Sequence, residues 1–144
     1  MVLQFCAMDS QQDSPKPPPA LVFWIIWFAI LNGLVMIQFM VGGGIPKGED
    51  HGKPPVELLA VATVLGLAAL AIRFLWIPQI NSVVKKLPAM IVGLALSEAI
   101  GFVGIFGVGK EFPATQQALF VAAVACIVSL APVYARPRLE NGRF

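Results

Sequence analysis

The sequence contains four blocks of about twenty consecutive, mostly apolar residues, and this feature constrains the fold more than any other. The blocks cover residues 20–41, 56–77, 88–109 and 115–134. A helix rises about 1.5 Å per residue, so each block is long enough to cross a hydrocarbon core of roughly 30 Å. We therefore predict an all-α integral membrane bundle of four transmembrane helices with up-down-up-down topology.

The composition indicates that lipid is the solvent of these blocks. Hydrophobic residues make up 58% of the 144 residues and charged residues 12%, against about 25% charged residues in ordinary soluble domains. Because the charges are too few to cover a soluble surface, we expect a lipid bilayer as the main partner. The formal net charge is only +2, and the basic C-terminal tail suits a membrane surface, so no nucleic-acid partner is expected.

Polar segments flank the four blocks at both ends of the sequence. Residues 1–19 form a proline-rich lead-in that we expect to be poorly ordered, and residues 135–144 form a basic tail. Asp9 and Asp13 stand where a secretory signal would carry basic residues. We therefore expect the first block to be retained as a transmembrane helix.

The distribution of Lys and Arg predicts the orientation of the bundle. The lead-in, the segment between the second and third blocks and the tail share one side, which carries seven basic residues: Lys16, Arg73, Lys85, Lys86, Arg136, Arg138 and Arg143. The other side carries Lys47, Lys53 and Lys110. This asymmetry predicts a multi-pass protein of the cell inner (plasma) membrane with both termini in the cytoplasm. Arg73 lies about one turn inside the second block, from where its side chain is expected to reach the head groups.

Glu98 is the most informative single residue, because it lies near the middle of the third block. An ionised carboxylate at the bilayer centre costs roughly 2.5 to 3.5 kcal/mol, so Glu98 must be protonated, partnered or both. One interpretation makes it an interhelical hydrogen-bonding group, and another makes it a proton or cation site with Ser97 and Asn32 as further candidates.

Asn32 lies in the first block at nearly the same depth as Glu98, so a hydrogen bond between the two is a specific hypothesis. Two alternatives stay open for the pair Asn32-Gly33. It could mark a local bend in the first helix, or an interface with a second copy of the chain.

Small residues recur at helical spacing in the last two blocks and predict close helix packing. In the third block they are Gly93, Ser97 and Gly101, and in the fourth they are Ala118, Ala122, Cys126 and Ser129. The connection between these blocks is short, so the third and fourth helices should be antiparallel neighbours.

Sequence motifs for catalysis or metal binding are missing. His51 is the sole histidine, and it lies in a polar, glycine-rich loop with no second metal ligand of the usual kind nearby. The sequence has no phosphate-binding loop, dinucleotide fingerprint or nucleophile elbow. We therefore predict no catalytic residue, no cofactor and no metal site, and a protein that is not an enzyme.

The third block, residues 90–105 (MIVGLALSEAIGFVGI), resembles the ion-binding helix of the proteolipid (subunit c) of rotary ATP synthases and V-type ATPases. The resemblance implies that Glu98 binds and releases H⁺ or Na⁺ in a rotating ring. The chain departs from that family in three ways. Its first block has bulky aromatic residues where the family has a glycine repeat, its carboxylate lies in the third helix, and its termini are predicted to be cytoplasmic. It also looks like small bacterial four-helix membrane proteins of unknown role.

Two functions from different classes remain open. The first is a non-enzymatic membrane subunit or accessory protein, in a homo-oligomer or a larger membrane complex, with Glu98 as a polar contact between helices. The second is a proton- or cation-coupled translocator, of which a rotor proteolipid is one form, with Glu98 as the ion site.

Overall fold

The computed structural model describes residues 20–135, and every regular element in that stretch is a helix. The four main helices are α1 (Ala20–Met40), α2 (Val56–Ala71), α4 (Val83–Phe102) and α5 (Pro113–Ser129). Short helical segments follow three of them: η1 (Ile72–Trp76) and α3 (Ile77–Gln79), η2 (Val103–Val108) and η3 (Gly109–Glu111), and η4 (Val133–Ala135). The predicted lead-in over residues 1–19 and the predicted tail after Ala135 lie outside the described residues.

The predicted all-α class is confirmed for the described part of the chain. Three helical spans are long and apolar enough to cross a membrane: Ala20–Met40 (21 residues), Val56–Gln79 (24 residues) and Val83–Glu111 (29 residues). The fourth, Pro113–Ser129, is also apolar but has only 17 residues.

The second helix ends later than predicted, because Pro78 does not stop it. η1 is a π turn, in which the N–H of Ile77 bonds to the carbonyl of Ile72, five residues earlier. The wider turn accommodates the proline, whose nitrogen has no hydrogen to donate. The helix therefore continues to Gln79, and only residues 80–82 connect it to α4.

The third helix begins at Val83, five residues before the predicted start at Pro88. The N–H groups of Lys85 and Lys86 bond to the carbonyl of Ser82, at 3.1 and 3.2 Å, and thereby form the first turn. Pro88 thus lies inside the helix, at the cost of one backbone hydrogen bond. The lysines predicted for a loop belong to a helix end.

The fourth helix was predicted to reach Tyr134, but it ends at Ser129. Pro132 is the physical reason, because it cannot donate the hydrogen bond that would extend the helix and it disfavours helical geometry in the preceding residue. The chain makes a tight turn there, with the N–H of Ala131 on the carbonyl of Val128 at 3.0 Å.

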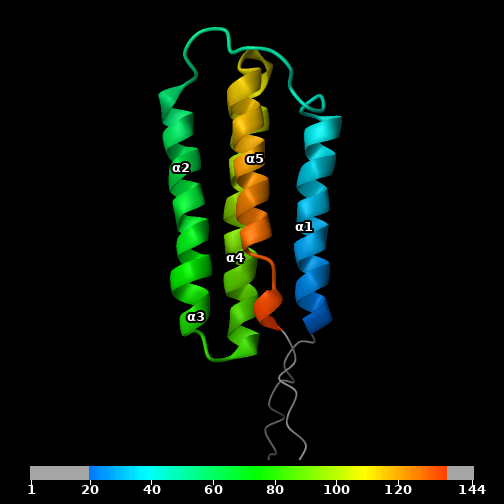
Figure 1. Cartoon of the computed structure of the whole chain (residues 1–144), viewed down its shortest axis with the longest axis vertical. Coiled ribbons are helices and arrows are strands. Elements are labelled where there is room, and N and C mark those ends of the chain that lie inside the picture. Colours follow the sequence, from blue (N-terminus) through cyan, green and yellow to red (C-terminus); the bar gives the residue numbers. More distant parts are fainter. Residues whose placement is uncertain (1–19, 136–144) are drawn as a thin grey trace, which may run out of the picture.

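The four helices form an antiparallel up-down-up-down arrangement, and both ends of the described chain lie at the same end of the molecule (Figure 1). The prediction that the third and fourth helices are neighbours is confirmed: α4 and α5 make the most extensive contact, and α1 and α2 pack against this central pair. Figure 1 shows α1 and α2 on opposite sides of it. The core contains aliphatic side chains from all four helices, among them Leu34, Ala62, Leu94 and Ile127.

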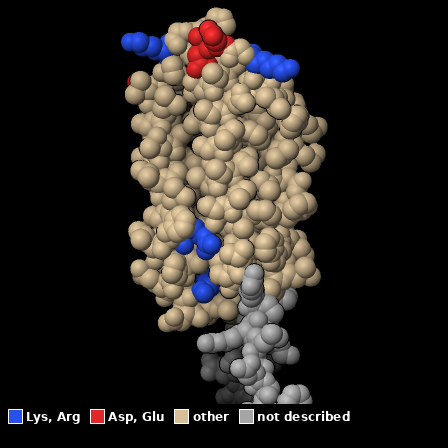
Figure 2. Space-filling model, in the orientation of Figure 1, with Lys and Arg blue, Asp and Glu red and all other residues tan. Residues whose placement is uncertain are grey.

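Apart from Glu98, the acidic and basic residues of the described chain lie toward the ends of the bundle. On the face seen in Figure 2, acidic and basic groups lie together at the end that carries the α1–α2 loop, basic groups lie near the other end, and the length between is uncharged. Large apolar side chains such as Leu67, Phe74 and Phe106 are more than half exposed along the helices. Apolar sides and charged ends are the surface pattern of a bundle surrounded by lipid.

Candidate functional site

Glu98 lies near the midpoint of the 29-residue span Val83–Glu111. It is half-buried, on the edge of α4 between the exposed Ile91 and Ala95 and the buried Leu94 and Gly101. The described residues offer its carboxyl group no hydrogen bond and no ion pair. A half-buried carboxyl group therefore lies halfway along the bundle, at the outer edge of α4, without a partner among residues 20–135.

The structure does not bring the three ion-binding candidates together. The amide nitrogen of Asn32 donates to the carbonyl of Phe28 in its own helix, at 2.8 Å, and the Asn32 side chain is exposed. The hydroxyl of Ser97 is fully buried and donates to the carbonyl of Gly93, at 2.9 Å. The hypothesised Asn32–Glu98 hydrogen bond is thus not formed: the Asn32 amide bonds to its own helix backbone, and the Glu98 carboxyl group has no partner among the described residues.

Gly93 and Gly101 of α4 lie at close helix contacts, but with different neighbours. A Cβ atom at Gly101 would be 2.5 Å from Cδ1 of Leu34 in α1, and one at Gly93 would be 3.0 Å from Cδ2 of Leu130 at the end of α5. These glycines therefore receive leucine side chains from two helices. They do not form one seam against a single partner helix.

The small residues of α5 were predicted to pack against α4, but they lie outside the α4–α5 contact. Ala118 and Ala122 are exposed, Cys126 and Ser129 are half-buried, and the buried side of α5 carries Leu119, Ala123 and Ile127 instead. The Ser129 hydroxyl bonds to its own helix, on the carbonyl of Cys126 at 2.7 Å.

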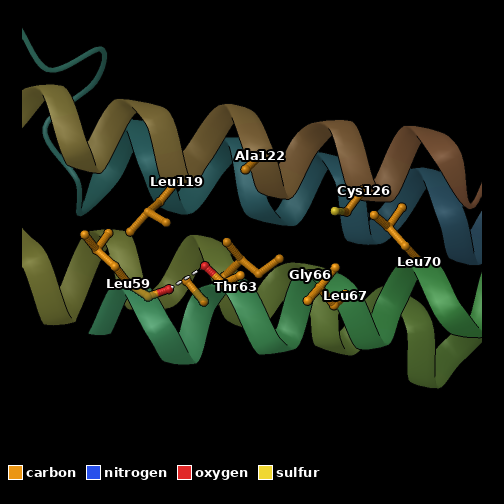
Figure 3. A pocket seen from close by; sticks show the side chains of 10 residues that line it. Leu59, Thr63, Gly66, Leu67, Leu70, Leu119, Ala122 and Cys126 are labelled. Atoms are coloured by element: carbon orange, nitrogen blue, oxygen red, sulfur yellow. Dashed lines mark hydrogen bonds between the residues drawn. The ribbon is translucent and has the colours of Figure 1, made fainter. Parts of the chain in front are cut away.

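Figure 3 shows Ala122 and Cys126 in an apolar groove between α2 and α5, opposite Thr63, Gly66 and Leu67. The groove has a volume of about 270 Å³. The small side chains thus leave space between two helices, whereas the larger ones of α5 face α4.

Arg73 turns toward the protein, although it was predicted to extend to the head groups. Its Nε donates to the carbonyl of Ser129 at 2.7 Å, and its guanidinium lies 5.0 Å from the ring centre of Tyr134. Trp27 Nε1 donates to another carbonyl at this end of α5, that of Ile127, at 2.8 Å. A cation at a helix C-terminus is favourable because of the helix dipole.

Asp50 has a role that sequence reasoning missed, since the loop around it was assigned no site. Its carboxylate accepts hydrogen bonds from the backbone N–H groups of Ala114 and Thr115, at 2.8 and 3.2 Å, and from the Thr115 hydroxyl. The local N-cap position holds Phe112, which cannot cap, so Asp50 caps α5 from a loop 64 residues away. The Thr115 hydroxyl, helped by the two N–H groups, holds the pKa of Asp50 below its ordinary 3.8.

Two buried glutamines near the same end were also missed as site residues. Gln38 and Gln116 are each 1% exposed. Gln38 donates to the carbonyl of Gly44 at 2.7 Å but its amide oxygen has no partner, and neither amide atom of Gln116 has one within residues 20–135. The one sequence signal for Gln116 is its helical spacing from Leu119, Ala123 and Ile127, which places all four residues on the same side of α5.

Comparisons of the chain with protein-family models, with curated proteins and with solved structures found no match.

The positions of Glu98 and the buried glutamines favour binding and association. Within residues 20–135 no three His, Cys, Asp or Glu side chains come close enough to hold a metal ion. Glu98 can exchange a proton or accept a partner's hydrogen bond at the outer surface of α4. The buried glutamines provide unsatisfied amide groups at the end that carries the α1–α2 loop.

Proposed function

We propose that this chain is a non-enzymatic, multi-pass subunit of the cell inner membrane, which associates with another membrane polypeptide through the edge of α4 that carries Glu98. The partner is a second copy of the chain or a different membrane protein. Both termini of this chain lie in the cytoplasm, and its α1–α2 loop lies on the outer side of the membrane.

The helix lengths and surfaces support the membrane assignment. At about 1.5 Å per residue, the three long spans exceed the roughly 30 Å of a hydrocarbon core, and the 17 residues of α5 lie at the short limit for a spanning helix. Exposed apolar side chains along the helices suit contact with lipid.

The observation that carries the proposed association is the position of Glu98. A carboxyl group at the bilayer centre is costly, and it normally faces the interior of a bundle or a partner. Glu98 instead lies at the outer edge of α4, where the described chain offers it no hydrogen bond. A polar group on a neighbouring polypeptide would satisfy it, and such bonds between helices contribute about 0.6 to 2 kcal/mol.

Substitution of Glu98 tests this association. Glu98→Gln keeps hydrogen-bonding groups and should preserve the assembly, whereas Glu98→Ala should weaken it about 3- to 30-fold. The size of the purified assembly in detergent, measured by light scattering over a dilution series, is the readout. Glu57→Ala, at an exposed position in the first turn of α2, is the matched control. Assembly of Glu98→Ala equal to that of the control would refute the proposal.

A proton- or cation-coupled translocator is the second candidate, and the position of the half-buried Glu98 at the outer edge of α4 favours it. A carboxyl group there can be shared between neighbouring protomers, as the resemblance to rotor proteolipids implies. Glu98→Gln separates the two candidates, because an amide cannot release a proton. A translocator with this substitution would assemble normally and lose proton or Na⁺ flux in vesicles, whereas an accessory subunit would show no flux before or after it.

A further inference from the structure

The starting observation is the buried side chain of Gln116, which lines a cavity of about 250 Å³ between the α1–α2 loop and the beginning of α5. Neither its amide nitrogen nor its amide oxygen has a hydrogen-bond partner among residues 20–135. A buried amide without a partner is unfavourable, so a ligand that bonds to it gains affinity. The cavity is also larger than the roughly 30 Å³ that one water molecule occupies.

Two lysines give this cavity a positive charge. Lys47 from the loop and Lys110 from η3 both line it, next to the backbone of Gly42 and Gly43. A Cβ atom at Gly43 would be 3.7 Å from Nζ of Lys110, so the ammonium group lies beside the backbone of Gly43. The nearby carboxylate of Asp50 is bound to the start of α5, and no described acidic residue lines the cavity. The cavity is therefore suited to an anion.

An apolar groove of about 340 Å³ adjoins the cavity, and Ile45 and Pro46 line both. The groove lies between α1 and α5, with walls that include Val35, Phe39, Phe120, Val121 and Val124. In Figure 2 charged side chains gather at the loop end of the bundle, and the surface between them and the basic groups near the other end is uncharged. A charged pocket above an apolar groove matches a molecule with an anionic head and a hydrocarbon chain.

We propose that the cavity and the groove together bind one anionic phospholipid of the bilayer. Lys47, Lys110 and Gln116 hold its phosphate group, and the walls of the groove hold one acyl chain. The site is far along the bundle from Glu98 and does not depend on the association proposed for that residue. Under the predicted orientation it faces the outer leaflet.

Binding is tested on the full chain in an uncharged maltoside detergent, with phosphatidylglycerol as the probe and the melting temperature as the readout. Ligands that bind the folded state raise the melting temperature in a saturable way. We expect phosphatidylglycerol to do so, and phosphatidylcholine and glycerol 3-phosphate at equal concentration to bind at least about 10-fold more weakly. Equal binding of phosphatidylcholine would refute charge recognition. If glycerol 3-phosphate binds as tightly as phosphatidylglycerol, the cavity is a site for free anions and the groove contributes nothing, which would refute the lipid site.

Lysine substitutions test the head-group site. Lys47→Gln and Lys110→Gln should each weaken phosphatidylglycerol binding about 5-fold. Lys53→Gln removes an equal charge from the same loop but lines neither the cavity nor the groove, so it should leave binding unchanged. An equal loss in all three variants would show attraction to the surface as a whole and overturn the proposed site.

Gln116→Leu has a signature that a purely structural glutamine would not produce. Leucine removes the unpartnered amide, so the melting temperature of the lipid-free protein should stay unchanged or rise while the shift caused by phosphatidylglycerol shrinks.

Val121→Trp should block the groove, whereas Val128→Trp, at a similarly exposed position of α5 outside it, should not. If Gln116→Leu lowers the lipid-free melting temperature and keeps the full lipid shift, or if the two tryptophan variants bind alike, the proposal fails.

Discussion

Single glycines determine how closely the helices approach one another. Beyond Gly93 and Gly101, a Cβ atom at Gly104 would be 3.2 Å from that of Leu119, and one at Gly107 would be 3.0 Å from Cδ1 of Leu58. The span Val83–Glu111 thus receives leucine side chains from all three neighbouring helices at positions without a side chain. Gly33 of α1 differs, since a Cβ atom there would meet nothing within 4 Å.

The first prediction compares two helical glycines. Gly101→Ala should lower the stability of the bundle by about 1 to 2 kcal/mol, because the added methyl group would overlap Leu34, which is fully buried. Gly33→Ala should raise it by up to about 1 kcal/mol, because alanine favours a helix more than glycine does. Thermal unfolding in detergent measures both.

A compensating substitution provides the control for this pair. Leu34→Val added to Gly101→Ala should recover part of the lost stability, because the two positions are in contact. If Gly101→Ala is as stable as Gly33→Ala, the close approach of α1 to α4 is not as described.

Among the elements, α5 depends on other parts of the chain at both ends. The Asp50 carboxylate caps its beginning, while Trp27 and Arg73 bond to carbonyls at its end. Its own flanking residues provide no side-chain cap. Contacts with distant parts of the chain therefore position both ends of this helix, and its packing on α4 positions its length.

The pH dependence of the α5 cap provides the second test. The pKa of Asp50 is lower in the folded protein than its ordinary value of 3.8. Its contribution to the stability of the fold is therefore complete above a pH of about 3.8, and it is lost as the pH falls through the lower pKa of the folded state. The wild-type melting temperature should therefore fall below a pH of about 4, on top of any general acid effect. Asp50→Ala should lower the melting temperature at neutral pH and reduce this acid-dependent fall.

Glu49→Ala is the control for the capping experiment. Glu49 is exposed and precedes Asp50 in the same loop, but it makes no hydrogen bond to α5. The cap would be excluded if Asp50→Ala had the same melting temperature as the wild-type protein at neutral pH and the same dependence of melting temperature on acid pH.

At the scale of the whole molecule, the chain forms a central α4–α5 pair with α1 and α2 against it. The loop end carries the capped start of α5 and the proposed lipid site, and the other end carries the Arg73 and Tyr134 contact. Since both described ends of the chain lie at this second end, they must face the same side of any membrane that the bundle crosses (Figure 1).

Reporter fusions test the proposed orientation. A reporter after Phe144 should stay cytoplasmic, and one inserted at His51, in the exposed part of the α1–α2 loop, should be exported. An insertion at Asn81, between α3 and α4, serves as an internal control and should match the C-terminal fusion. The reverse pattern would place the lipid site at the cytoplasmic leaflet, and a mixed pattern would exclude a four-helix crossing.

The sequence by itself determined the helical class, the presence of four main helices and the neighbour relation of α4 and α5, but not that the fourth helix has only 17 residues. Apolar blocks of this length leave few alternatives, because every backbone polar group in lipid must be bonded internally. Helix boundaries were less predictable. Pro78 was expected to end the second helix and Pro88 to begin the third, but both lie inside helices. A π turn accommodates Pro78, and the loss of one backbone hydrogen bond accommodates Pro88.

Only the tertiary structure decided which side chains meet. The Asn32 amide bonds within its own helix, the small face of α5 turns toward α2, and Arg73 bonds to the end of α5. Asp50 caps a helix 64 residues away, and no local pattern encodes a contact over such a distance. Apolar periodicity is weak when a helix is apolar all round, so the sequence does not indicate its inward face. That choice depends on the fit of side chains such as Leu34 into gaps such as Gly101.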